Sequence, residues 1–166
     1  CVVALFILFG MQWQKQDNIV YVNVQQVYDE FQLKKELESK LTNVQQARKT
    51  MLDSLELSLK VLSGKIENSL QRDAERENNF IVLREEYVLK KNQFDEDNAL
   101  MTRQYSEQIM KQLNEYTQEY GKQNGYTYIL GAEGSGSVMY ASEKRDITKD
   151  VLDYINRRYK GEAKVQ

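Results

Sequence analysis

A polar run, Gln71-Arg-Asp-Ala-Glu-Arg-Glu-Asn-Asn79, interrupts a long helical pattern in the middle of this sequence of 166 residues. Between Leu33 and Lys122 there is no proline and no cluster of turn residues, so nothing else in that stretch forces a helix to end. The midpoint of residues 31–122 falls inside the polar run, so the helical stretches on its two sides have similar lengths. We therefore predict that the chain folds back at residues 72–79 into an antiparallel helical hairpin. A single uninterrupted helix of about 135 Å is the alternative.

Apolar residues recur at spacings of three and four on both sides of this run, which is typical of amphipathic helices that pack as a coiled coil. In a hairpin, each apolar stripe covers the other. Arg48, Lys65 and Asn98 fall near seam positions and make the pattern imperfect. The first stripe comprises Leu37, Leu41, Val44, Met51, Leu55, Leu59, Leu62, Ile66 and Leu70, and the second comprises Phe80, Leu83, Tyr87, Phe94, Met101, Tyr105, Ile109, Leu113, Tyr116 and Tyr120.

Strand-like segments lie on both sides of the helical region. Residues 19–24 are β-branched and aromatic, and residues 126–130 and 138–141 have a similar character. The glycine-rich residues 131–136 between the last two segments predict a hairpin turn. Because a helical hairpin returns the chain to its starting point, we expect the first strand to pair with the other two.

A final helix is predicted after the last strand, with Asp146 or Thr148 as its N-terminal cap. Its apolar side carries Ile147, Val151, Leu152, Ile155 and Tyr159. The fold class is therefore α+β: a small base of strands and helix, and a long coiled-coil arm. The predicted organisation is a linker at 14–18, a base formed by 19–30 and 123–160, an arm at 31–122 and a tail at 161–166.

Composition narrows the class of protein further. The chain has no histidine, no proline and one cysteine, and its net charge is −2. These counts exclude Ser-His and Cys-His catalysis, intrachain disulfides and cysteine-cluster metal sites, and they give no electrostatic case for nucleic-acid binding. We expect no enzyme, no cofactor and no metal. A base of only about 60 residues buries too small a core to be stable by itself, so we also expect oligomerisation.

The N-terminal residues 1–13 are strongly apolar, with an uninterrupted run from Cys1 to Phe9. Because roughly 20 residues are needed to cross a bilayer, the segment predicts a truncated signal peptide or the second half of a membrane anchor. No small-residue cleavage pattern follows the run, which favours an uncleaved anchor in the inner membrane. Lipidation of Cys1 and burial as a globular helix are the alternatives.

The two ends of the chain resemble the Skp/OmpH family of periplasmic chaperones. Ile19-Val-Tyr-Val-Asn-Val-Gln-Gln-Val-Tyr28 is similar to the opening of that family. Gly125-Tyr-Thr-Tyr-Ile-Leu130, Val138-Met-Tyr-Ala141 and the more specific run Asp146-Ile-Thr-Lys-Asp-Val-Leu152 are similar to its ending. The resemblance extends over about residues 19–159, and the coiled-coil middle matches in character only.

This resemblance implies a jellyfish-like homotrimer, in which three bases form a β-barrel-like body and three hairpins enclose a cavity. It also implies an ATP-independent holdase in the periplasm of a Gram-negative bacterium, which binds unfolded outer-membrane proteins and prevents their aggregation. Residues 33–122 carry 15 Lys and Arg against 16 Asp and Glu, unlike the strongly basic arms of members that bind acidic surfaces. Binding of lipopolysaccharide or anionic lipid is therefore left open.

Two sets of residues are expected to carry such a function. The trimer base would comprise Ile19, Val20, Tyr21, Val22, Val24, Tyr128, Ile129, Leu130, Val138 and Tyr140. Contact with clients would involve Leu55, Leu62, Ile66, Leu70, Phe80, Leu83, Tyr87, Phe94, Met101 and Tyr105 on the arms. The rival hypothesis is a membrane-anchored coiled-coil component of a cell-envelope assembly, which fits the stripes and the apolar N-terminus equally well but fits the strand-loop-strand ending less well.

Overall fold

The computed structural model describes residues 18–69, 71–132 and 138–162. They divide into two compact units, which we call the arm unit (Glu36–Gln108) and the base unit (the described residues up to Lys35 and from Ile109). The apolar segment 1–13 lies outside the described residues. Within the described ranges, none of the helices is both long enough and apolar enough to cross a membrane.

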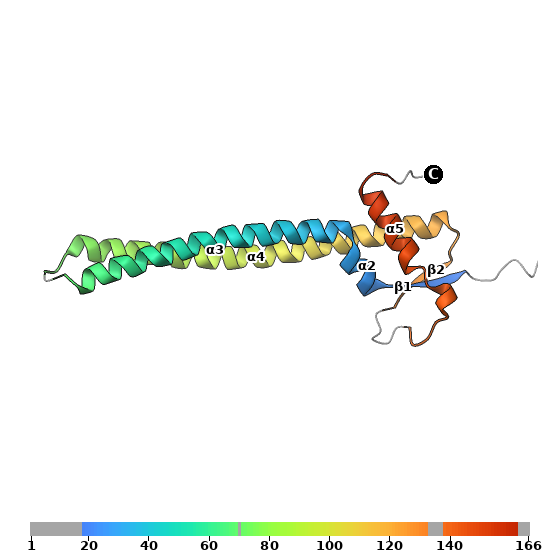
Figure 1. Cartoon of the computed structure of the whole chain (residues 1–166), viewed down its shortest axis with the longest axis horizontal. Coiled ribbons are helices and arrows are strands. Elements are labelled where there is room, and N and C mark those ends of the chain that lie inside the picture. Colours follow the sequence, from blue (N-terminus) through green and yellow to red (C-terminus); the bar gives the residue numbers. More distant parts are fainter. Residues whose placement is uncertain (1–17, 70, 133–137, 163–166) are drawn as a thin grey trace, which may run out of the picture. The chain divides into compact units, whose positions relative to one another are not determined.

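Helices make up most of the described chain (Figure 1). The elements in order are β1 (Ile19–Asn23), α2 (Val24–Glu30), α3 (Gln32–Glu67), α4 (Ala74–Gln123), β2 (Tyr128–Ala132), the short 3-10 helix η1 (Glu143–Arg145) and α5 (Thr148–Tyr159).

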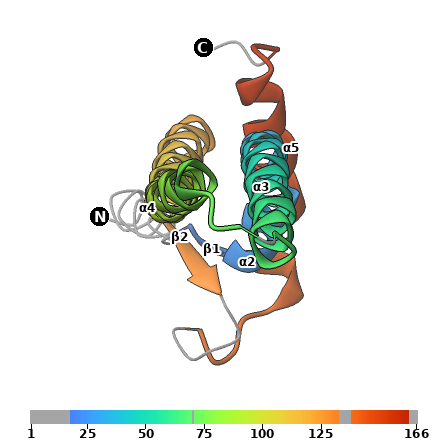
Figure 2. The same cartoon turned by 90° about the vertical axis from the view of Figure 1, so that its left-hand side faces the viewer.

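The predicted helical hairpin is present in the arm unit, where α3 and α4 run side by side in opposite directions (Figures 1 and 2). The single-helix alternative is therefore wrong. The connection lies at residues 68–73, earlier than the predicted 72–79, because Asp73 starts a new helix. Its carboxylate accepts a hydrogen bond from the Arg76 amide at 3.2 Å, and its carbonyl accepts one from the Glu77 amide at 3.1 Å.

A polar layer crosses the seam of the arm unit at two of the three imperfect positions, Arg48 and Asn98. The Arg48 guanidinium donates to the Asn98 side-chain oxygen and, at 3.2 Å, to the Asp97 carboxylate. It also lies over the Phe94 ring, 5.2 Å from the ring centroid. Because such a layer pairs only in one alignment of the helices, it favours a single register of the hairpin.

Replacing Arg48 with Leu should therefore destabilise the arm by about 1–2 kcal/mol, since Asp97 and Asn98 lose their partner in a half-buried seam. The double variant Arg48→Leu/Asn98→Leu should recover most of this loss, because both seam positions become apolar. Urea unfolding followed by circular dichroism measures both effects. A double variant no more stable than the single one would contradict the pairing.

The base unit is built on a two-stranded parallel sheet. β1 pairs with β2 from Ile19 opposite Tyr128 to Asn23 opposite Ala132. Parallel pairing requires a long crossover connection, which the helices between the strands supply. On the other side of β1, the Ile147 amide donates to the Tyr21 carbonyl at 3.0 Å and brings the start of α5 against the sheet. The buried apolar core of this unit comprises Val20, Val22, Val27, Phe31, Leu33, Ile109, Leu113, Ile147, Val151, Leu152, Tyr154 and Ile155.

Three details of the strands differ from the sequence prediction. Val24 begins α2 and does not extend β1, because the Asn23 side chain accepts a hydrogen bond from the Gln26 amide at 3.0 Å and caps the helix. Gly131 belongs to β2 and not to a turn, and a side chain there would lie 2.7 Å from Val24 Cγ2. The predicted strand at 138–141 is not formed, since β2 pairs with β1 and no described strand lies beside these residues. Most of the predicted turn lies outside the described residues.

A break separates α2 from α3 at Phe31, whose backbone is extended (φ −67°, ψ 126°). The side chain of Asn156 on α5 bridges this break. Its oxygen accepts a hydrogen bond from the Gln32 amide at 2.8 Å, and its amide nitrogen donates to the Glu30 carbonyl at 3.3 Å. Asn156 thus satisfies one backbone group from each helix end at the point where the helical bonds are interrupted.

The N-cap residue of α5 is Ile147 and not the predicted Asp146 or Thr148, because the helix begins at Thr148. The carboxylate of Asp146 nevertheless binds the first residue of this helix. Burial raises the pKa of this carboxyl, but hydrogen bonds from the Thr148 hydroxyl and amide and from the Tyr21 hydroxyl lower it by more, so that its pKa lies below the ordinary value. The Thr148 hydroxyl in turn accepts a hydrogen bond from the Asn23 amide at 2.8 Å. Asp146 therefore joins α5 to β1.

Because the folded-state pKa of Asp146 is depressed, its contribution to stability is complete above the unfolded value of about 3.9 and is lost as the pH falls through the folded value. We expect Asp146→Asn to lower the free energy of unfolding on the order of 1 kcal/mol at pH 7, discounted for the exposure of this residue. The difference from the natural chain should shrink as the pH falls below the unfolded value. Urea titrations at several pH values test this. A constant difference between the two proteins at all pH values would exclude the proposed role of the charge.

Candidate functional site

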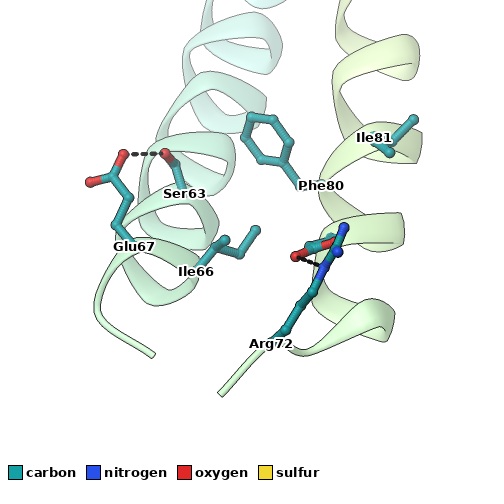
Figure 3. Close-up of a pocket in the computed structure, with 7 residues that line it drawn as sticks. Ser63, Ile66, Glu67, Arg72, Phe80 and Ile81 are labelled. Atoms are coloured by element: carbon teal, nitrogen blue, oxygen red, sulfur yellow. Dashed lines mark hydrogen bonds and ion pairs between the residues drawn. The ribbon is translucent and has the colours of Figure 1, made fainter. Parts of the chain in front are cut away.

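The apolar stripe residues predicted to contact clients form the seam between α3 and α4. Nine of the ten are described, and all nine are half-buried; Leu70 lies outside the described residues. Figure 3 shows the arrangement near the turn, where the Phe80 ring points from α4 toward α3. The helices of the hairpin therefore use much of this surface to pack on each other. The nine described residues are Leu55, Leu62, Ile66, Phe80, Leu83, Tyr87, Phe94, Met101 and Tyr105.

A second set of apolar side chains is exposed on the outer sides of the arm unit, and the sequence analysis did not single it out. Ile81 is 54% exposed and Leu89 is 70% exposed on α4, and Leu57 is 63% exposed on α3. The signal is present in the sequence, since Ile81 and Val82 recur seven residues later as Val88 and Leu89. The exposed large apolar residues of this set are Leu57, Val61, Ile81, Val82, Val88, Leu89 and Leu100. Met51, which belongs to the predicted first stripe, is also exposed.

A cleft of about 450 Å³ lies between the two helices near the turn (Figure 3). The seam residues Ile66 and Phe80 supply apolar surface, and charged side chains surround it. Arg72 Nε donates to both carboxylate oxygens of Glu77, at 3.0 and 3.1 Å. This hydrogen-bonded ion pair raises the pKa of the Arg72 guanidinium. The cleft can therefore take an apolar side chain beside a fixed pair of opposite charges.

A second hollow, of about 400 Å³, lies on α4 alone and is lined by Ile81, Arg84, Glu85, Val88 and Leu89. Its apolar residues belong to the exposed set described above. Within the described part of the chain, Arg84 and Glu85 form no hydrogen bond or ion pair with other side chains. Both charges remain available to a bound molecule.

The residues predicted for the base separate into buried and exposed groups. Val20 and Val22 belong to the core, whereas Tyr21, Val24, Ile129 and Val138 are half-buried. Ile19, Tyr128, Leu130 and Tyr140 are exposed. Tyr140 and its neighbour Met139, which the prediction omitted, are 88% and 90% exposed. The base thus presents an apolar surface in addition to its own core.

The tyrosines near the end of α4 pack in the base core and not along the arm. Tyr120 lies 5.2 Å from Tyr154 and 6.1 Å from Tyr126, measured between ring centroids. Burial, together with the neighbouring Tyr126 and Asp150, raises the pKa of Tyr120 to about 12. Glu119 accepts a hydrogen bond from Arg158 Nε at 2.9 Å and joins α4 to α5 beside this cluster. These contacts hold α4 against α5 within the base unit.

A chain that combines a long helical hairpin with a small strand-and-helix unit, and that exposes apolar side chains on both, has the surfaces of a binding protein. Residues 18–155 match the family model described as outer membrane protein (OmpH-like). The chain belongs to this OmpH-like family.

Two known proteins illustrate the relationship. The chaperone protein Skp of Yersinia enterocolitica is 25% identical over 142 residues, which cover 82% of this chain and 85% of that protein. The crystal structure of a candidate outer membrane chaperone (OmpH-like) from Caulobacter crescentus is similar with a TM-score of 0.71 at 14% identity, over 85% of each chain. The second likeness concerns the fold alone.

Proposed function

We propose that this protein is an ATP-independent holdase chaperone of the periplasm, which binds unfolded outer-membrane proteins in a trimeric cage. The observation that carries the proposal is the exposed apolar side chains along both helices of the arm unit. Membership of the OmpH-like family and the likeness to the chaperone Skp support the class of client.

Binding alone is sufficient for such a function. A protein that binds unfolded chains lowers their free concentration and slows their aggregation without consuming energy. Each arm offers several small apolar contacts separated by charged residues, so a client is held weakly at many points. Release then requires only a folding partner that binds the client better.

Features of the base unit support association with further copies. A two-stranded sheet is marginally stable by itself, and β2 has only one neighbouring strand in the described part of the chain. Residues 138–141 have strand-like composition, and Met139 and Tyr140 are almost fully exposed. Pairing of this segment with a neighbouring copy covers these side chains and continues the sheet. In this proposal, the predicted base residues together form the contact between copies.

The direct test uses purified residues 18–166 and an outer-membrane β-barrel protein unfolded in urea and diluted into buffer. We expect stoichiometric suppression of light scattering without ATP, and a solution mass three times that of one chain. A mass of one or two chains would contradict the trimer. Unchanged aggregation of the client would contradict the chaperone function.

Client binding should depend little on salt, because the arm carries 15 positive and 16 negative charges over residues 33–122. Many of these charges are already paired locally, as in the Lys91–Asp95 ion pair at 2.8 Å. We expect the client dissociation constant to change less than tenfold between low salt and about 0.5 M salt, where screening acts within a few ångströms. A larger weakening would mean that a charged surface carries the binding.

A further inference from the structure

We propose that the outward face of α4 between Ile81 and Leu89, and not the opposite face of α3, is the principal surface on which an arm holds an extended segment of an unfolded client. This inference rests on the proposed chaperone function and names the surface that performs it. We call the four residues Ile81, Val82, Val88 and Leu89 the α4 patch.

The α4 patch is contiguous because of helix geometry. Ile81 and Val88 are seven residues apart, as are Val82 and Leu89, so each pair lies on one side of the helix two turns apart, about 10.5 Å along the axis. Figure 3 shows that Ile81 points away from α3, whereas the adjacent Phe80 points toward it. The hollow of about 400 Å³ includes three of the four patch residues. Ile81 also lines the cleft between the two helices, so the patch extends from the edge of that cleft over the outward face of α4.

The size of the α4 patch favours an extended segment over a second folded copy. Four aliphatic side chains exposed by roughly half offer on the order of 200–300 Å² of apolar surface. A stable interface between folded proteins needs about 800 Å² on each partner. The patch also ends after two turns, because the same helix face carries Asn78 before it and Asn92 and Glu96 after it. A second long helix therefore has little further apolar surface to cover.

An extended segment of five or six residues, about 17–20 Å long, spans the patch and presents two or three side chains on one side. Unlike a helix, it brings backbone amides and carbonyls that need partners. Arg84 and Glu85 lie in the same hollow and make no side-chain hydrogen bond or ion pair elsewhere in the described ranges. The Arg84 guanidinium can donate to the segment's carbonyls, and the Glu85 carboxylate can accept from its amides. The patch thus matches an unfolded chain in both apolar and polar groups.

The outward face of α3 is a weaker candidate at the same level of the arm. Ile66 and Phe80 line one cleft, and Arg48 contacts Asp97, so residues 57–61 of α3 lie level with about residues 84–89 of α4. There, α3 exposes only Leu57 and Val61 as large apolar residues on the side away from α4. This face therefore supplies a matched control: its exposed residues are also aliphatic, and they lie at the same distance along the arm.

The test compares two double variants of the full-length assembly, Ile81→Gln/Leu89→Gln and Leu57→Gln/Val61→Gln. Glutamine keeps helix propensity close to that of leucine, so helicity should be retained and is checked by circular dichroism. The probe is a fluorescently labelled outer-membrane β-barrel protein, unfolded in urea and diluted into buffer. We expect the α4 pair to weaken client binding at least tenfold and the α3 pair to weaken it less than threefold.

Equal losses in the two variants, or a larger loss in the α3 pair, would overturn the assignment of the face while leaving the chaperone function intact. A change in the mass of the assembly with unchanged client affinity would make the patch a contact between copies and would also overturn the proposal. If the natural chain itself fails to bind the probe, the proposed function is wrong and the inference falls with it.

A second measurement does not depend on affinity. In a Cys1→Ser background, Glu85→Cys and Lys60→Cys each place one thiol on the outward face of α4 or α3, and each is labelled with a benzophenone maleimide. Illumination in the presence of the unfolded client should crosslink it from position 85 at several times the yield from position 60. Similar yields from the two positions, or a higher yield from position 60, would contradict the proposal.

Discussion

Val22→Asp is expected to unfold the base unit and to yield monomers. Val22 is 6% exposed and pairs with Gly131 in the sheet, so an aspartate there places an unpaired carboxylate in an apolar core. The cost of such a change exceeds about 4 kcal/mol, which is a large share of the stability of a small unit. Circular dichroism melting and solution mass by light scattering measure the loss.

Asn23→Asp is the matched control for this variant. It adds the same negative charge at the next position of β1, where the side chain is exposed and caps α2, and aspartate caps a helix as well as asparagine does. The control should keep the natural mass and melting temperature. A Val22→Asp protein with native mass and native melting would contradict the position of β1 in the core of the base.

Phe31→Ala should have the second largest effect, a loss of about 3–5 kcal/mol in the free energy of unfolding. Phe31 is fully buried at the break between α2 and α3. Its ring meets Tyr116 and Tyr159 edge to face, at centroid distances of 6.4 and 5.9 Å. Truncation therefore removes both a large buried surface and two aromatic contacts, and it leaves a cavity where α2, α4 and α5 meet.

Phe31→Leu separates the contribution of the buried volume from that of the aromatic contacts. It keeps most of the buried volume but removes the ring contacts, and we expect it to cost about 1–2 kcal/mol. Chemical unfolding monitored by tyrosine fluorescence and by circular dichroism provides both values. If alanine costs no more than leucine, the site can collapse around the smaller side chain and the aromatic cluster is not the main contact holding these helices.

The hairpin could be predicted because helix periodicity is a local property that survives folding. The stripes that contain Leu55 and Phe80 pack together as expected, and even the imperfect positions Arg48 and Asn98 proved to be partners. The position of the turn was harder to predict from the sequence, because a polar run is compatible with both a loop and a solvated helix. The cap at Asp73 decides between them.

Other features depend on contacts between distant parts of the chain. Residues 138–141 have the composition of a strand, but strand formation requires a neighbouring strand, and none lies beside them in the described part of the chain. The role of Asn156 has no local signature, because its two backbone partners lie at the other end of the chain. The outward apolar residues Ile81 and Leu89 could not be predicted for a different reason: one apolar stripe per helix is sufficient to form the hairpin, so the helical pattern does not require a second one.

The long-range bonds of the base fix the order in which the molecule can assemble. Gln32 and Asn156 are 124 positions apart, and Asn23 and Thr148 are 125 apart, whereas α3 and α4 meet beside their connecting turn. Nearby contacts form sooner than distant ones, so the hairpin can close before the base is complete. During synthesis, β1 emerges before β2 and α5, so its apolar side is uncovered until those elements are made. For that interval, β1 is itself an exposed apolar segment of the kind that the finished protein is proposed to protect.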